Sequence, residues 1–81
     1  MKEKLQCFLD KDLKYYNEYF RVTKWDKDDS FWIDFKCFKG GSYSDVAFMV
    51  TKVTSKEIFC KGFILKNTVK LTITLDEIQI L

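Results

Sequence analysis

The sequence contains no histidine, which removes the side chain most often used as a general base and as a metal ligand. Its serines therefore have no Ser–His partner, and its cysteines have no imidazole that would activate a thiol. The only adjacent carboxylates are Asp28-Asp29 and Asp76-Glu77. Because neighbours along a strand point to opposite faces, neither pair makes a convincing acid–base dyad. We expect no enzymatic activity, no catalytic residue, no metal and no cofactor.

Two further motifs are incomplete. Residues 26–30 supply the acids of a calcium loop, but Phe31 stands where that loop needs glycine and Cys37 where it needs a bidentate glutamate. Gly40-Gly41 is not followed by the Gly-Lys-Ser/Thr of a phosphate-binding loop. A polar turn and a hairpin loop are the simpler interpretations.

Proline is absent and glycine occurs only three times, which excludes a collagen-like or loop-rich chain. The apolar fraction of 47% argues against disorder, and 81 residues allow one domain, residues 1–81. No apolar run approaches the roughly 18 residues of a membrane span, and no signal peptide is evident. The three separated cysteines, Cys7, Cys37 and Cys60, are typical of reduced core thiols, so we expect a cytoplasmic protein with no membrane partner.

Arginine is also scarce, because Arg21 is the only one among 14 basic residues. Arginine supplies most bidentate contacts to phosphates and guanines. With a net charge of only +2, the sequence favours a protein partner over nucleic acid.

The N-terminal part predicts an amphipathic helix over Lys4–Phe20, within a helical segment spanning residues 1–22. An alternative treats residues 10–12 as a turn, makes Leu5–Leu9 a strand and starts a second strand near Tyr15. The helix rests on apolar residues at three- and four-residue spacing: Leu5, Phe8, Leu9, Leu13, Tyr16 and Phe20.

The remainder, residues 31–81, predicts an antiparallel β-meander with short turns. Residues 39–45 form the clearest loop, Lys66-Asn67 a tight turn, and Gly62 marks a bend or bulge within a strand. The fold class is therefore α+β, with an N-terminal helix against a strongly bent five-stranded sheet. The five expected strands are Phe31–Phe38, Val46–Val53, Ile58–Leu65, Val69–Leu75 and Ile78–Leu81.

This order of elements resembles the small SH3-like and Sm-like barrels. The resemblance rests on strand spacing, the Gly40-Gly41 loop, Gly62, and the one-turn break at Asp76-Glu77 before a short last strand. It implies a closed or nearly closed barrel. Of the RNA-pocket signature of Sm-like proteins, only Lys61-Gly62 is echoed, and it precedes Val69–Leu75 rather than the final strand.

Alternation places several large apolar side chains on outward strand faces: Trp32, Phe38, Met49, Phe59 and Phe63. Burial of each is worth roughly 1.5–3 kcal/mol, so we expect the helix to cover some of them and a partner or second subunit the rest.

These side chains and nearby lysines form the candidate binding surface. It could be core beneath the helix, a protein interface, or a surface that stacks bases and tracks phosphates. The candidate residues are Trp32, Lys36, Phe38, Lys39, Tyr43, Phe59, Lys61 and Phe63.

A lone small domain without catalytic groups is similar in kind to the inhibitor proteins of bacterial viruses, including anti-CRISPR proteins, which occlude the surface of a host enzyme. We therefore expect a non-enzymatic protein that acts through a protein–protein interface. The alternatives are an Sm-like or SH3-like nucleic-acid-binding protein, as a ring or dimer, and a self-associating structural subunit.

Overall fold

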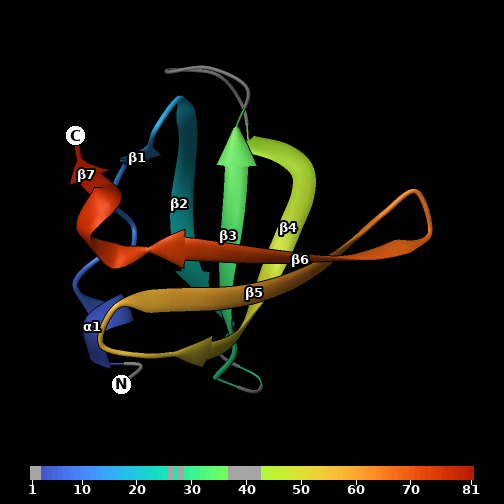
Figure 1. The fold of residues 1–81 in the computed structure, drawn as a ribbon, viewed down its shortest axis with the longest axis horizontal. Helices are drawn as coiled ribbons and strands as arrows, with labels where there is room; N and C mark the ends of the chain where they lie inside the picture. The colour runs from blue at the N-terminus through green and yellow to red at the C-terminus, as the bar shows by residue number, and fades with distance from the viewer. Residues whose placement is uncertain (1–2, 26, 28, 37–42) are drawn as a thin grey trace.

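The computed structural model describes residues 3–25, 27, 29–36 and 43–81. Its main feature is one antiparallel sheet of seven strands in the order β6-β5-β4-β3-β2-β1-β7 (Figure 1). The elements are α1 (Glu3–Gln6), β1 (Leu13–Tyr15), β2 (Glu18–Lys24), β3 (Phe31–Lys36), β4 (Tyr43–Val53), β5 (Glu57–Ile64), β6 (Asn67–Thr74), the 3₁₀ turn η1 (Leu75–Glu77) and β7 (Ile78–Ile80).

The α+β prediction is wrong, and so is the N-terminal helix over residues 1–22. Of residues 3–22, which the structure describes, four are helical, Glu3–Gln6, and the strands β1 and β2 take up much of the rest. Asp10 (φ 60°) and Tyr16 (φ 54°) adopt left-handed backbone conformations that a right-handed helix does not contain. The alternative with a turn at residues 10–12 and a strand near Tyr15 lies closer to the structure.

The later strands are largely confirmed. β3, β5, β6 and β7 lie within two residues of their expected bounds wherever the chain is described, and η1 occupies the expected one-turn break. Two details differ. β4 begins at Tyr43, which the sequence placed in a loop, and the hairpin turn falls on Leu65-Lys66 instead of Lys66-Asn67.

The sheet curls until its two ends approach each other, which forms a half-barrel. β6 and β7 are joined only by η1, yet β7 pairs with β1 at the opposite end of the strand order. The Thr74 N–H donates to the Tyr15 hydroxyl over 3.2 Å, and the Leu75 N–H donates to the Lys56 carbonyl over 2.8 Å. The first bond holds the end of β6 near β1, and the second ties the start of η1 to the residue before β5.

The core lies inside this curl, between β2–β3 and the β5–β6 pair that crosses in front of them (Figure 1). The inward side chains of six strands and Leu5 of α1 fill it. Its buried members are Leu5, Leu13, Phe20, Val22, Phe31, Ile33, Phe48, Val50, Val53, Ile58, Cys60 and Ile73.

Two features bend the sheet around this core. The β4–β5 ladder shifts register between Val50 and Lys52, a bulge that leaves Thr51 as the extra residue. Gly62 lies under the ring of Phe48, and a Cβ built on it would be 2.8 Å from Phe48 Cδ1 and 3.0 Å from the Ala47 carbonyl oxygen. The expected bend at Gly62 thus has a physical cause, because only glycine allows β5 to pass this close to β4.

Replacing Gly62 with alanine should lower the free energy of unfolding by about 1–3 kcal/mol, because the buried Phe48 ring and a backbone carbonyl leave no room for a methyl group. Phe63→Ala, at the neighbouring 72% exposed position, is the control and should change stability by less than about 0.5 kcal/mol. Urea denaturation of both variants measures this. Equal stabilities would show that the Phe48 contact does not constrain the fold.

Candidate functional site

A row of side chains crosses the convex, outer face of the sheet from β3 to β6. Trp32 pairs with Met49, Met49 with Lys61, and Lys61 with Lys70. Paired residues of antiparallel strands point to the same face, so these four lie side by side. We call them the outer row. All four are half-buried or exposed, whereas the inward-facing Ile33, Phe48 and Cys60 of β3, β4 and β5 are buried.

Trp25 extends the outer row at its β3 end. Its ring stacks on that of Trp32, with 5.4 Å between ring centroids and 29° between their planes. The Trp32 indole N–H donates to the Ser30 hydroxyl over 3.0 Å. Trp25 remains 54% exposed, so the pair presents a flat aromatic surface that a partner can contact.

A groove of about 470 Å³ opens beside the other end of the row. The bulge at Thr51 shapes it, and the Thr51 hydroxyl donates to the Phe59 carbonyl over 3.1 Å. The groove is lined by Thr51, Lys52, Phe59, Cys60, Lys61, Lys70, Leu71 and Thr72.

The groove is positively charged. Among the described residues that line it, Lys52, Lys61 and Lys70 are basic and none is acidic. Lys61 and Lys70 face each other directly across the β5–β6 ladder, an arrangement of like charges that destabilises a sheet. Within the described part of the chain, none of these three lysines has an ion-pair partner. The local charge is therefore available to an anionic group.

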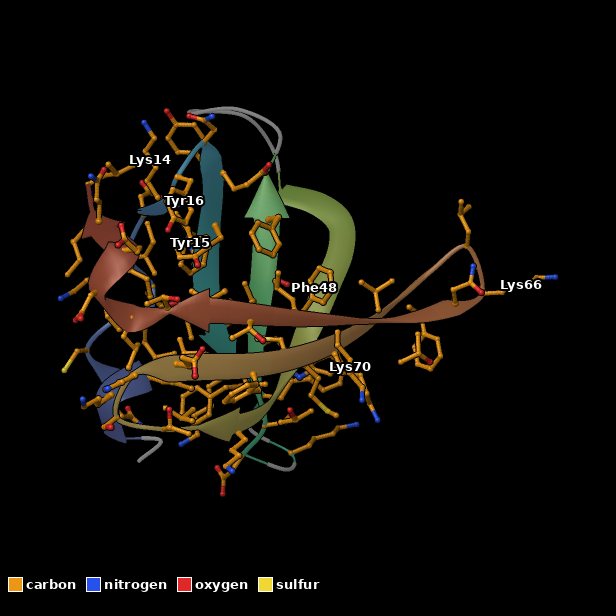
Figure 2. All side chains as sticks on the ribbon, in the orientation of Figure 1. Lys14, Tyr15, Tyr16, Phe48, Lys66 and Lys70 are labelled. Carbon is orange, nitrogen blue, oxygen red and sulfur yellow. The ribbon has the colours of Figure 1, made fainter. Side chains whose placement is uncertain are left out.

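The β5–β6 hairpin projects beyond the body of the molecule, with Lys66 at its tip (Figure 2). Phe63 is 72% exposed and Leu65 is 90% exposed. Leu65 (φ 50°) and Lys66 (φ 69°) both occupy the left-handed region, where two-residue hairpin turns normally carry Asn or Gly. The tip thus combines exposed apolar surface with backbone strain, and strain of this kind clusters at functional sites.

Of the predicted site residues, Trp32, Phe59, Lys61 and Phe63 share the outer face. Because α1 is only four residues long, the expected helix is not there to cover them. The backbones of Lys36 and Tyr43 pair across β3 and β4, at a distance along the strands from the groove. Phe38 and Lys39 lie outside the described residues.

Sequence reasoning missed Trp25, Lys52, Lys70 and the strained tip, Leu65-Lys66. The position of the hairpin turn sets the register between β5 and β6. A turn at Leu65-Lys66 places Lys61 opposite Lys70, whereas a turn one residue later would place Lys61 opposite Thr72. Alternation does not separate the two registers, because a two-residue shift moves no side chain to the other face.

A second exposed apolar group lies at the far side of the molecule, around β1 and β7. Figure 2 places Tyr16 there, opposite Lys66. Tyr16, Ile80 and Leu81 are each more than half exposed. The nearby carboxylate of Glu77 raises the pKa of the Tyr16 hydroxyl above its ordinary value.

The described residues contain no cluster of three or more side chains suited to bind a metal ion. Over the same residues, no helix has the length and hydropathy needed to span a bilayer. Cys7 and Cys60 carry free thiols, and burial raises the pKa of Cys60 to about 12. Cys60 is therefore a protonated, unreactive core thiol.

No protein-family model matches the chain, and no curated protein sequence or solved structure shows significant similarity to it.

Replacing Leu65-Lys66 with Asn-Gly should raise the free energy of unfolding by about 1 kcal/mol or more, because these residues tolerate the left-handed conformation. The matched control is Ala-Ala, which removes the same side chains without relieving the strain. Thermal and urea unfolding compare the two. An Asn-Gly variant no more stable than Ala-Ala would contradict strain at the tip.

Cys7 should react with iodoacetamide at pH 8 much faster than Cys60, because Cys7 is exposed while Cys60 is buried with a pKa of about 12. Peptide mapping of the alkylated protein reads each site separately, and unfolding in urea should abolish the difference. Burial raises the pKa of the Cys60 thiol in the folded state, so the thiol stabilises the folded state below about pH 9. This stabilisation is lost as the pH rises toward 12. Equal alkylation of both folded-state thiols would contradict this burial.

Proposed function

We propose that this chain is a non-enzymatic binding protein that acts through a protein–protein interface. The interface comprises the outer row, the groove and the tip of the β5–β6 hairpin. The observation that carries the proposal is the projecting tip, where Phe63 and Leu65 are exposed on a strained turn. A chain selected only for stability would place Asn or Gly in that turn and polar side chains beside it.

The chemistry of this surface supports a protein partner. Large aromatic side chains dominate the binding energy of protein interfaces, and Phe63 with the Trp25–Trp32 stack supplies them at two separate places. Leu65, which is 90% exposed, adds an apolar anchor at the turn of the hairpin. A cleft on the partner would accommodate the hairpin, while the flatter outer row would contact the rim of that cleft.

The mechanism we propose is steric inhibition of a host enzyme in the cytoplasm, as in the small inhibitors of bacterial viruses, including the anti-CRISPR type. Inserting a hairpin into a functional cleft needs shape and anchors but no catalytic group. The free thiols of Cys7 and Cys60 suit a reducing compartment.

We also propose that the half-barrel belongs with the small SH3-like and Sm-like barrels. Two features support this: the 3₁₀ turn η1 before the last strand, and the pairing of that last strand with β1. The bulge in β4 and the glycine in β5, which bend consecutive strands, also suit a barrel that closes.

A second candidate function is binding of single-stranded nucleic acid. The stacked pair Trp25–Trp32 could accept bases, and Lys52, Lys61 and Lys70 could contact phosphates. Self-association of a structural subunit is a third candidate, favoured by the exposed apolar groups at the hairpin tip and around Tyr16.

Binding to a partner purified by affinity capture should weaken by at least about 2 kcal/mol for Trp32→Ala and for Phe63→Ala if both are anchors. Tyr16→Ala is the matched control, an aromatic residue of similar exposure on the far side, and should bind as the wild type does. Calorimetry measures the affinities, and thermal unfolding verifies that each variant is folded. If only Tyr16→Ala lost binding, the interface would instead lie on β1 and β7.

Tryptophan fluorescence should not change when oligothymidylate or oligouridylate is added at low salt, because the proposed partner is a protein. The stacked Trp25 and Trp32 make the test sensitive, since a base stacking on them would quench emission. Quenching that weakens steeply with salt would favour the nucleic-acid function instead.

A further inference from the structure

We infer that the open edge of β6 accepts an extended segment of the partner in which acidic and apolar residues alternate, added to the sheet as an eighth strand. The inference rests on the proposed protein-binding function and names the chemistry of the partner. Three observations carry it: backbone groups on the open side of β6, Lys70 on its outer face opposite Lys61 of β5, and half-buried apolar side chains on its inner face.

β6 is an end of the strand order, so one of its two sides has no neighbouring strand. A two-residue hairpin closes with a hydrogen-bonded pair, here Ile64 with Asn67. The alternation of the ladder then points the N–H and C=O groups of Thr68, Lys70 and Thr72 away from β5. Thr74, next in this series, confirms the direction, because its N–H donates to the Tyr15 hydroxyl instead of to β5.

The side chains of β6 define what the added strand must carry. On the outer face, Lys70 lies directly opposite Lys61, and neither has an ion-pair partner within the described residues. Carboxylates on the same face of an added strand would lie beside Lys70 and relieve this repulsion. On the inner face, Val69 and Leu71 are only half-buried, so apolar side chains of the added strand would complete their burial.

These features favour a peptide over the other occupants. A phosphodiester chain lacks the alternating donors and acceptors that match a strand edge, so it would satisfy the lysines but not the backbone. A second copy of this chain paired through β6 in a register centred on Lys70 would bring the single β6 lysine of each copy close together, which adds repulsion where an acidic segment removes it.

The probe is an eight-residue peptide of alternating Val and Glu, blocked at both ends and titrated into the ¹⁵N-labelled full chain. The expected result is saturable shifts of the Thr68, Lys70 and Thr72 amides, with an affinity of about 1 mM or tighter. The same peptide with N-methyl groups on alternate residues cannot extend the ladder. It should bind at least about tenfold more weakly.

Three variants separate the contribution of the backbone from that of the charge. Thr72→Pro removes one outward N–H and leaves the bonds to β5, so it should weaken binding about tenfold, whereas Thr72→Ala should not. Lys70→Glu should abolish binding of the Glu peptide and allow binding of a Val-Lys peptide of equal length. Should Thr72→Pro unfold the protein, the N-methylated peptide makes the same test on the wild-type chain.

Two results with the peptides would overturn the inference: no shift of the β6 amide signals with the Glu peptide at millimolar concentration, or equal binding of the N-methylated peptide. Two further results would also overturn it: a shift of these amide signals only with oligothymidylate, or a shift that depends only on protein concentration. The last two would assign the edge to nucleic acid or to a second copy. None of these decides the proposed function, because the Trp32→Ala and Phe63→Ala measurements on the captured partner do not involve the β6 edge.

Discussion

The approach of the Phe48 ring to the bare backbone of Gly62 is the constraint on which the rest of the structure depends. It allows β5 to pass close over β4, and together with the bulge at Thr51 it curls one sheet around its own core. Because the curl is that tight, η1 can bring β7 from the end of β6 to the far edge, beside β1. Beyond Leu5 of the four-residue α1, the sheet therefore covers its own inner face.

The same curl determines what remains on the outside. The inner side chains of β2 to β6 are used in the core, and the outer row of Trp32, Met49, Lys61 and Lys70 faces away from it. The hairpin continues past the body of the molecule, so its tip contributes little to the core (Figure 1). At this tip and on the adjoining ladder the chain accepts left-handed Leu65-Lys66 and opposed lysines, both of which lower stability. Features that lower stability and gather on one surface are a reason to assign that surface to binding.

The sequence predicted the C-terminal meander well because strict alternation has no helical interpretation there. It failed at the N-terminus for a specific reason: Leu13 and Phe20 are seven residues apart, which is two helical turns, and they are also direct partners in the β1–β2 hairpin. The spacing alone therefore does not distinguish a helix from a hairpin. The left-handed backbone at Tyr16 and the pairing of β2 with β3 make this segment a hairpin. The candidate site was found through its aromatic residues, whereas Lys70 and the strained tip depend on a turn position that alternation does not fix.

The most direct test of the account is hydrogen–deuterium exchange of the chain, free and bound to its captured partner. The account predicts slower exchange in the bound state across β5 and β6, residues 57–74, and unchanged exchange in β1 and β7. Protection confined to β1 and β7, around Tyr16 and Ile80, with β5 and β6 unaffected, would contradict the claim that the β5–β6 hairpin and the outer face beside it form the binding surface.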